Sequence, residues 1–196
     1  MTHYFTDNDS LRSDRKEFTY HFDNETFTFT TDVGVFSKSE VDFGSYLLIK
    51  NVYRKPLGEL CLDLGSGYGP IGIIVKRFNP SLTMDAVDVN SRAIELTKLN
   101  AKINNVEIQT YKTDDILTLN KSYDTILLNP PIRTGKIIIY GLYEKAHAAL
   151  KNEGSLYIVI RKKQGADTSY QKLKDIFKEV NIVAKEKGYV VIQAIK

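Results

Sequence analysis

A dense run of glycines directly after an apolar segment is the feature that most constrains the fold of this chain. Four of its 12 glycines lie in residues 65–72, directly after the mainly apolar segment Leu60–Leu64. Pro70 lies among them at a position where its missing N–H costs a helix nothing. A buried strand, a tight glycine turn and a helix N-terminus are therefore predicted here. This is the start of a nucleotide-binding βαβ unit.

The rest of the chain alternates between apolar runs and amphipathic segments, which is typical of an α/β protein. Asn90-Ser91 can cap one of the helices between the strands. Only residues 185–188 separate the last two strands, too few for a crossover, so these strands are expected to pair antiparallel. The predicted fold is Rossmann-like: a mostly parallel seven-stranded sheet with helices on both faces and one antiparallel pair at the C-terminus. The predicted strands are Leu60–Leu64, Leu82–Val87, Val106–Tyr111, Thr125–Leu128, Leu156–Ile160, Val180–Ala184 and Tyr189–Ile195.

A segment with a different pattern precedes this core. Aromatic and polar residues alternate from Phe18 to Phe29 around Asp23-Asn24, which predicts a β-hairpin with one buried face. A helix is expected over about residues 42–53. At roughly 100–200 residues per domain, the 196 residues predict one domain over 1–196. Within it, a hairpin and helix extension covers 1–55 and an α/β core covers 56–196.

Composition excludes several other classes of protein. The longest uncharged stretch, residues 64–75, is shorter than the ~20 apolar residues of a membrane span. The N-terminus lacks a signal sequence, so a cytoplasmic location is expected.

Cys61 is the one cysteine and excludes a disulfide framework, while His3, His21 and His147 are too scattered to hold a metal. The net charge of +3 permits nucleic-acid contact without requiring it. The oligomeric state stays open, with a monomer favoured.

Acidic residues around the glycine loop indicate its cofactor. Gly67–Gly72 matches the G-x-G-x-x-G pattern of dinucleotide sites, but Asp63 would repel a pyrophosphate at the same helix N-terminus. S-adenosylmethionine carries an ammonium and a sulfonium and no phosphate, so an acid beside the loop favours it. Asp88 ends the next strand, where its carboxylate can accept both ribose hydroxyls. The predicted cofactor is therefore S-adenosylmethionine.

The predicted cofactor site extends to further loops of the sheet. Asp114 and Asp115 follow the third strand, and either can lie near an adenine amino group. The full set of predicted cofactor-binding residues is Asp63, Gly65, Ser66, Gly67, Tyr68, Gly69, Asp88, Val89, Asp114, Asp115, Asn129 and Phe36.

An asparagine and two prolines directly after an apolar strand indicate the reaction. Pro130 has a fixed φ and holds Asn129 extended, so the Asn129 amide oxygen and the Pro130 carbonyl are expected to converge as acceptors. Such a pair suits a planar exocyclic amine and would position its nitrogen for methyl transfer without a metal or a strong base. The predicted catalytic residues are Asn129, Pro130, Pro131 and Ile132.

These motifs resemble those of the small members of the ribosomal RNA small-subunit guanine-N2 methyltransferase family. Residues 63–69, Asp88 and residues 129–136 carry the resemblance, together with residues 31–38, 41–45 and 163–166. It implies a class I methyltransferase fold, S-adenosylmethionine as donor and a guanine amino group in RNA as acceptor. Larger members carry an additional N-terminal domain. Ile132 also departs from the aromatic residue that many related enzymes have there.

Other acceptors are compatible with the same residues. A protein glutamine (N5) or an adenine (N6) also presents a planar NH₂, and a non-catalytic RNA-binding module could retain the cofactor pocket. Cytosine-C5 methylation needs a cysteine nucleophile, whereas Cys61 is expected to be buried.

RNA is the expected partner, either ribosomal RNA or a small-subunit assembly intermediate. Loops at the carboxyl ends of parallel strands gather at one edge of the sheet. The cations expected to bind RNA at this edge are Arg133, Lys136, Arg161, Lys162 and Lys163.

Overall fold

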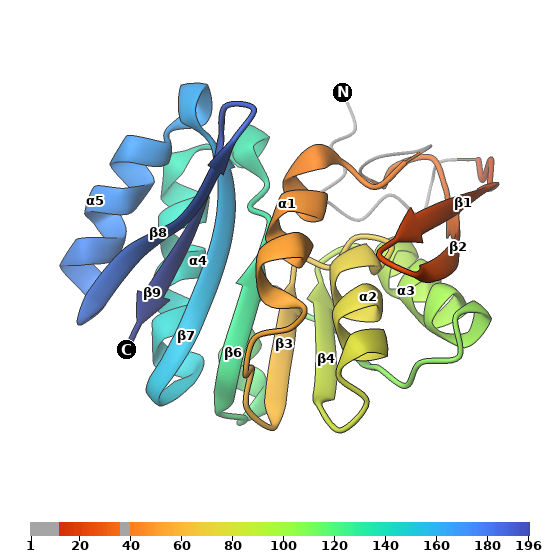
Figure 1. Cartoon of the computed structure of the whole chain (residues 1–196), viewed down its shortest axis with the longest axis horizontal. Coiled ribbons are helices and arrows are strands. Elements are labelled where there is room, and N and C mark those ends of the chain that lie inside the picture. Colours follow the sequence, from red (N-terminus) through yellow and green to blue (C-terminus); the bar gives the residue numbers. More distant parts are fainter. Residues whose placement is uncertain (1–11, 36–39) are drawn as a thin grey trace.

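A computed structural model describes residues 12–35 and 40–196 of the chain. Its centre is a seven-stranded sheet in the order β5-β4-β3-β6-β7-β9-β8 (Figure 1). Strand β9 runs antiparallel to both of its neighbours, and every other neighbouring pair is parallel. The predicted Rossmann-like fold is confirmed. The strands are β3 (Leu60–Leu64), β4 (Thr83–Asp88), β5 (Gln109–Lys112), β6 (Tyr123–Leu128), β7 (Leu150–Arg161), β8 (Glu179–Glu186) and β9 (Tyr189–Ile195).

Helices cover both faces of this sheet (Figure 1). Helices α1 (Phe43–Val52), α2 (Pro70–Phe78) and α3 (Ser91–Ile103) pack on one face, and α4 (Lys136–Ala149) and α5 (Ala166–Ile176) pack on the other. A hydrophobic core cluster lies on each face of the sheet. Successive side chains of a strand point to opposite faces, so Cys61 belongs to the first cluster and Leu62 to the second. Pro70 opens α2 and Asn90 caps α3, as predicted.

The predicted hairpin is confirmed as β1 (Lys16–Phe22) and β2 (Glu25–Thr31). Its buried aromatic side chains, including Phe27 and Phe29, share one hydrophobic cluster with α1 and α2. Side chains of α3 pair with the open edge of β2. The Asn100 amide bonds the N–H and C=O of Thr30 at 2.7 and 2.8 Å, and Asn104 bonds those of Thr28 at 2.9 and 2.8 Å. The two amides therefore replace a neighbouring strand.

Two of the predicted strands begin three or more residues away from the observed start, whereas the other strand ends differ by at most two residues. The strand expected from Val106 begins at Gln109, because the Val106 N–H bonds the Ala101 carbonyl at 3.0 Å and closes the C-terminus of α3. The strand expected from Leu156 begins at Leu150, because the exposed polar residues 151–153 continue the strand before a shift in register with β6. Neither difference moves the carboxyl ends of the strands.

Candidate active site

A cavity of about 460 Å³ opens at the carboxyl edge of the parallel strands. The loops after β3, β4, β5 and β6 all contribute to its wall, which is where open α/β sheets bind ligands. The predicted site residues that line it are Gly65, Ser66, Gly67, Tyr68, Asp88, Val89, Asp114, Asn129, Pro130 and Pro131. The cofactor loop and the Asn-Pro-Pro turn therefore face one cavity.

The glycine loop presents bare backbone to this cavity. Gly65 and Gly67 have φ of 75° and 58°, in the left-handed region that favours glycine. Among the residues that the structure describes, a Cβ added at Gly65 would meet nothing within 4 Å, and one at Gly67 would meet only Val35, at 4.0 Å. Gly69 has a different role: it allows close packing of the backbone against α2 and α3, because a Cβ there would lie 2.9 Å from Ile73 and 3.0 Å from Thr97.

Asp63 lies fully buried behind the loop and outside the cavity lining. Its Oδ2 accepts a hydrogen bond from the Gly72 N–H at 2.8 Å, whereas its Oδ1 has no partner among the described residues. Burial and, to a smaller extent, the neighbouring Asp88 carboxylate raise the pKa of Asp63 to about 7, although the Gly72 N–H lowers it. This carboxyl group therefore acts on the cavity through its charge and ionises more readily when a cation is near.

Asp88 lines the cavity at the end of β4. Its Oδ2 accepts from the Gly67 N–H at 2.9 Å and its Oδ1 from the Asn90 N–H at 2.9 Å. Burial raises the pKa of Asp88 to about 6, although these backbone donors lower it. No Lys or Arg within 12–35 or 40–196 pairs with Asp63 or Asp88. Two carboxylates without a cationic partner beside open glycine backbone fit a cationic ligand such as S-adenosylmethionine.

The two acids after β5 have different surroundings. Asp114 lines the cavity. Asp115 caps the short helix η1 (Ile116–Leu119) by accepting from the Leu117 N–H at 3.2 Å, and it lies 3.6 Å from the Lys145 ammonium. The geometry therefore favours Asp114 over Asp115 as the residue near an adenine ring.

Two side chains from the start of α1 hold the amide of Asn129. The Asn129 Nδ2 donates to Ser45 Oγ at 3.0 Å and to Asp42 Oδ1 at 3.3 Å. Among the described residues nothing donates to the Asn129 oxygen, so that atom is the free acceptor of the amide. Asp42 also caps α1 by accepting from the Gly44 and Ser45 N–H groups. Asp42 and Ser45 both line the cavity, and neither was predicted as a site residue from the sequence.

The N-terminal segment supplies one wall of the cavity through Val35. Asp32, almost fully buried, accepts from Ser13 Oγ, the Asp14 N–H and the Val33 N–H, each at 2.7 Å. Burial alone would raise the pKa of Asp32, but these donors and the nearby Arg92 guanidinium lower it below its ordinary value. This arrangement fixes the backbone that leads to Val35.

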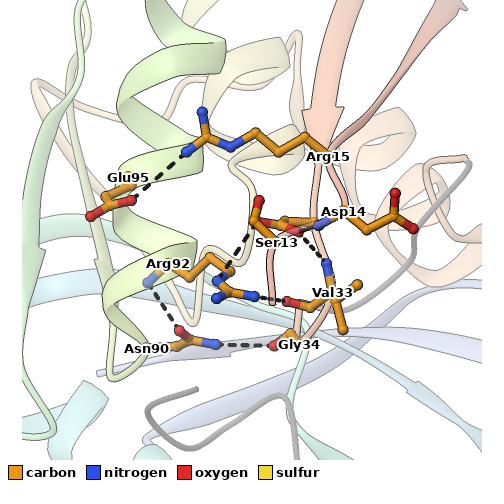
Figure 2. Close-up of polar contacts among 9 residues, drawn as sticks. Ser13, Asp14, Arg15, Val33, Gly34, Asn90, Arg92 and Glu95 are labelled. Carbon is orange, nitrogen blue, oxygen red and sulfur yellow. Dashed lines mark hydrogen bonds and ion pairs between the residues drawn. The ribbon is translucent and has the colours of Figure 1, made fainter. Parts of the chain in front are cut away.

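Helix α3 holds the same segment from the other side (Figure 2). The Arg92 guanidinium donates to the Val33 carbonyl at 2.7 Å, and Asn90 Nδ2 donates to the Gly34 carbonyl at 3.1 Å. Arg92 also lies 3.7 Å from Asp32. Residues just past Asp88 therefore position the wall opposite the glycine loop. Phe36, a predicted cofactor residue, lies outside the described residues.

The remaining predicted residues lie around the cavity. Ile132 begins the short helix η2 (Ile132–Thr134), packs on the second core cluster and does not line the cavity. Arg133 and Lys136 are exposed beside the lining residues Thr134 and Ile138. The exposed residues Arg161, Lys162 and Lys163 end β7 and form helix η3 (Lys162–Gln164). Within the part of the chain that the structure describes, no carboxylate pairs with these five cations.

Cys61 and His147 have no place in this site. Cys61 is fully buried, as predicted, and burial raises the pKa of its thiol. His147 packs edge-on against Phe177, and burial lowers its pKa. Over the described ranges, no helix is long and apolar enough to cross a membrane, and no cluster of side chains could hold a metal ion.

Residues 26–193 match the model of the methyltransferase small domain. This chain belongs to that family. Its family and fold are those of S-adenosylmethionine-dependent methyltransferases, which agrees with the predicted cofactor.

Individual relatives refine the comparison. The uncharacterized protein YbxB of Bacillus subtilis is 42% identical over 99% of this chain and 98% of its own length. The ribosomal RNA small subunit methyltransferase C of Aliivibrio fischeri is 35% identical over 74% of this chain, which spans 43% of that relative. A solved structure of the T. thermophilus 16S rRNA N2 G1207 methyltransferase, in complex with AdoMet and guanosine, superposes with a TM-score of 0.83 at 23% identity. That match covers 93% of this chain and 50% of the other.

Proposed function

We propose that the protein transfers a methyl group from S-adenosylmethionine to the N2 amine of a guanine in ribosomal RNA. The observation that carries this proposal is the orientation of Asn129. Its amide nitrogen is engaged by Ser45 and Asp42, so its oxygen is left to face the cavity as an acceptor. The curated relatives named for small-subunit ribosomal RNA, similar over most of this chain, favour the same substrate.

The residues of the turn have a defined part in this chemistry. When bound, S-adenosylmethionine supplies an electrophilic methyl group on its sulfonium. The Asn129 Oδ1 and the Pro130 carbonyl accept the two N–H groups of the incoming amine and hold its nitrogen toward the cofactor side of the cavity. Fixed acceptors stabilise the positive charge that develops on the amine nitrogen as its bond to the methyl carbon forms and the methyl–sulfur bond breaks. The nitrogen then gives up one proton to water, and the donor is left as a neutral thioether.

The cofactor residues divide into three roles under this proposal. Gly65 and Gly67 let the backbone approach the ligand, Asp88 accepts the ribose hydroxyls, and Asp63 favours the cationic methionine end by its charge. Asp114 is assigned to the adenine amino group.

Incubation of the purified protein with small-subunit ribosomal RNA and S-adenosylmethionine carrying an isotope-labelled methyl group tests the substrate. Digestion to nucleosides and mass spectrometry are expected to find label in N2-methylguanosine. Label in N6-methyladenosine, or in the glutamines of an added ribosomal protein fraction, would assign the alternative acceptor. No label in any of the three would support the non-catalytic alternative.

A further inference from the structure

A ladder of cations and aromatic rings lies beside the candidate active site and has no part in the chemistry above. The Arg161 guanidinium lies 4.9 Å from the centroid of the Tyr189 ring. The Tyr189 ring is 5.4 Å from that of Phe43, and the Lys187 ammonium lies 4.9 Å from the Phe43 centroid on the same ladder. Cations over aromatic faces are held in a defined place without a carboxylate partner.

The sheet fixes the position of this ladder. Arg161 and Tyr189 are directly opposite in the antiparallel pairing of β7 and β9. The Lys162 N–H donates to the Gly188 carbonyl at 2.8 Å. Lys187 and Gly188, with φ of 47° and 78°, form the two-residue turn between β8 and β9. Arg161 therefore sits on rigid elements and not on a long loop.

The ladder adjoins the catalytic turn through α1. A Cβ added at Gly44 would lie 3.1 Å from a Tyr189 ring carbon and 3.6 Å from Asn129 Nδ2, so both side chains pack on the same point of the helix. Leu128 pairs with Ile158 in the parallel register of β6 and β7. Arg161 consequently emerges at the same edge of the sheet as Asn129.

A second cavity, of about 440 Å³, lies between α5 and the β8–β9 turn on the far side of Tyr189. The lysines Lys162, Lys185 and Lys187 line it. Asp167 and Glu186 line it as well, but Glu186 is neutralised by the Lys50 ammonium at 3.0 Å. The surplus of positive charge is complementary to a phosphate group.

We propose that Arg161, held over Tyr189, is a platform on which a base next to the target guanine stacks, and that the lysines of the second cavity bind the phosphate of that nucleotide. Arg161 is exposed and, among the described residues, forms no ion pair or side-chain hydrogen bond, so its outer face is open. Unstacked bases of RNA are recognised on aromatic rings and arginine planes. An enzyme that acts on a base amine takes that base out of its stack. This inference rests on the proposed RNA substrate.

A short single-stranded RNA in which 2-aminopurine follows each guanine tests the platform, because stacking changes the fluorescence of this base analogue. The wild-type protein is expected to bind it with a fluorescence change. Arg161→Lys keeps the charge and loses the plane, so binding is expected to weaken about tenfold and the fluorescence change to disappear. The slope of log affinity against log salt stays the same, since no phosphate contact is lost.

Two further variants separate stacking from charge. Lys185→Gln is expected to reduce the salt slope by about 0.7 and to leave the fluorescence change in place. Lys178→Gln, which removes an exposed pair with Glu153, is the control and leaves both unchanged. Wild-type fluorescence and affinity in Arg161→Lys would overturn the platform while RNA methylation stands. Failure of the wild-type protein to bind any RNA would contradict the proposed substrate together with the platform.

Discussion

At the scale of single residues, we expect Asp63 to couple cofactor binding to pH. Its folded pKa of about 7 lies above the ordinary value of 3.8. The folded, cofactor-free protein therefore holds a proton that the unfolded chain has lost between those values, and its stability falls as the pH rises across that window. A bound cation favours the ionised carboxylate and reverses this effect.

Binding of S-adenosylmethionine is accordingly expected to release protons near pH 6.5 and to weaken as the pH falls below about 7. Calorimetry in two buffers with different ionisation enthalpies measures the proton release. In Asp63→Asn, affinity drops and most of the proton release disappears, while Asp88, with a pKa of about 6, retains the smaller part. Equal binding heats in the two buffers for the wild-type protein would show that no proton is released on binding and that Asp63 does not change its ionisation.

At the scale of elements, the segment that leads from β2 to Val35 depends on Asp32. Asp32→Asn replaces an acceptor of several hydrogen bonds and is expected to destabilise the protein by roughly 1–3 kcal/mol at neutral pH. Because the folded pKa of Asp32 lies below its unfolded value, this contribution is present above about pH 4 and is lost as the pH falls further. Urea unfolding at pH 7 and pH 3 measures both ends of that range.

The same variant is expected to raise the KM for S-adenosylmethionine several-fold and to leave kcat nearly unchanged, because the Val35 wall loosens without a change at Asn129. Glu95→Gln is the matched control. It removes only the exposed pair with Arg15 at 3.9 Å and changes stability by less than about 0.5 kcal/mol. A KM in Asp32→Asn equal to that of the control would mean that the segment does not shape the cofactor site.

The cofactor half of the site could be predicted because its signals are local. The glycine spacing after β3 and the acid that ends β4 follow from chain order alone. The partners of Asn129 could not be predicted, since Asp42 is 87 residues away and Ser45 is 84 residues away. Asp42 is recognisable in the sequence as a helix cap. Its second role, as an acceptor for the Asn129 amide, produces no pattern in the sequence.

Strand order shows the same limit. The short connection between β8 and β9 established that they pair antiparallel. It did not establish that β9 inserts between β7 and β8, and that insertion is what places Tyr189 opposite Arg161. Contacts of this kind depend on which faces pack together and not on the residues next to them in the chain.

At the scale of the whole molecule, both proposed binding surfaces lie at one edge of the sheet. The net charge is only +3, so the proposed recognition of RNA depends on where the cations lie. Arg161, Lys162 and Lys163 follow β7, while Arg133 and Lys136 follow β6. The hairpin and α1 share a core cluster with residues of β3, β4, β6, β7 and β9, and Asp42 and Ser45 of this extension also hold the Asn129 amide.

The central claim is that this amide directs methyl transfer to a guanine amine in ribosomal RNA. Its most direct test is mass spectrometry of ribosomal RNA nucleosides from cells that lack the chain and carry either the wild-type protein or Asn129→Ala. Without the chain, one N2-methylguanosine is expected to be missing. The wild-type protein restores it, whereas Asn129→Ala, with turnover lower by ~10²–10³, does not within the same growth period. An unchanged nucleoside profile in cells that lack the chain, or full restoration by Asn129→Ala, would contradict the account.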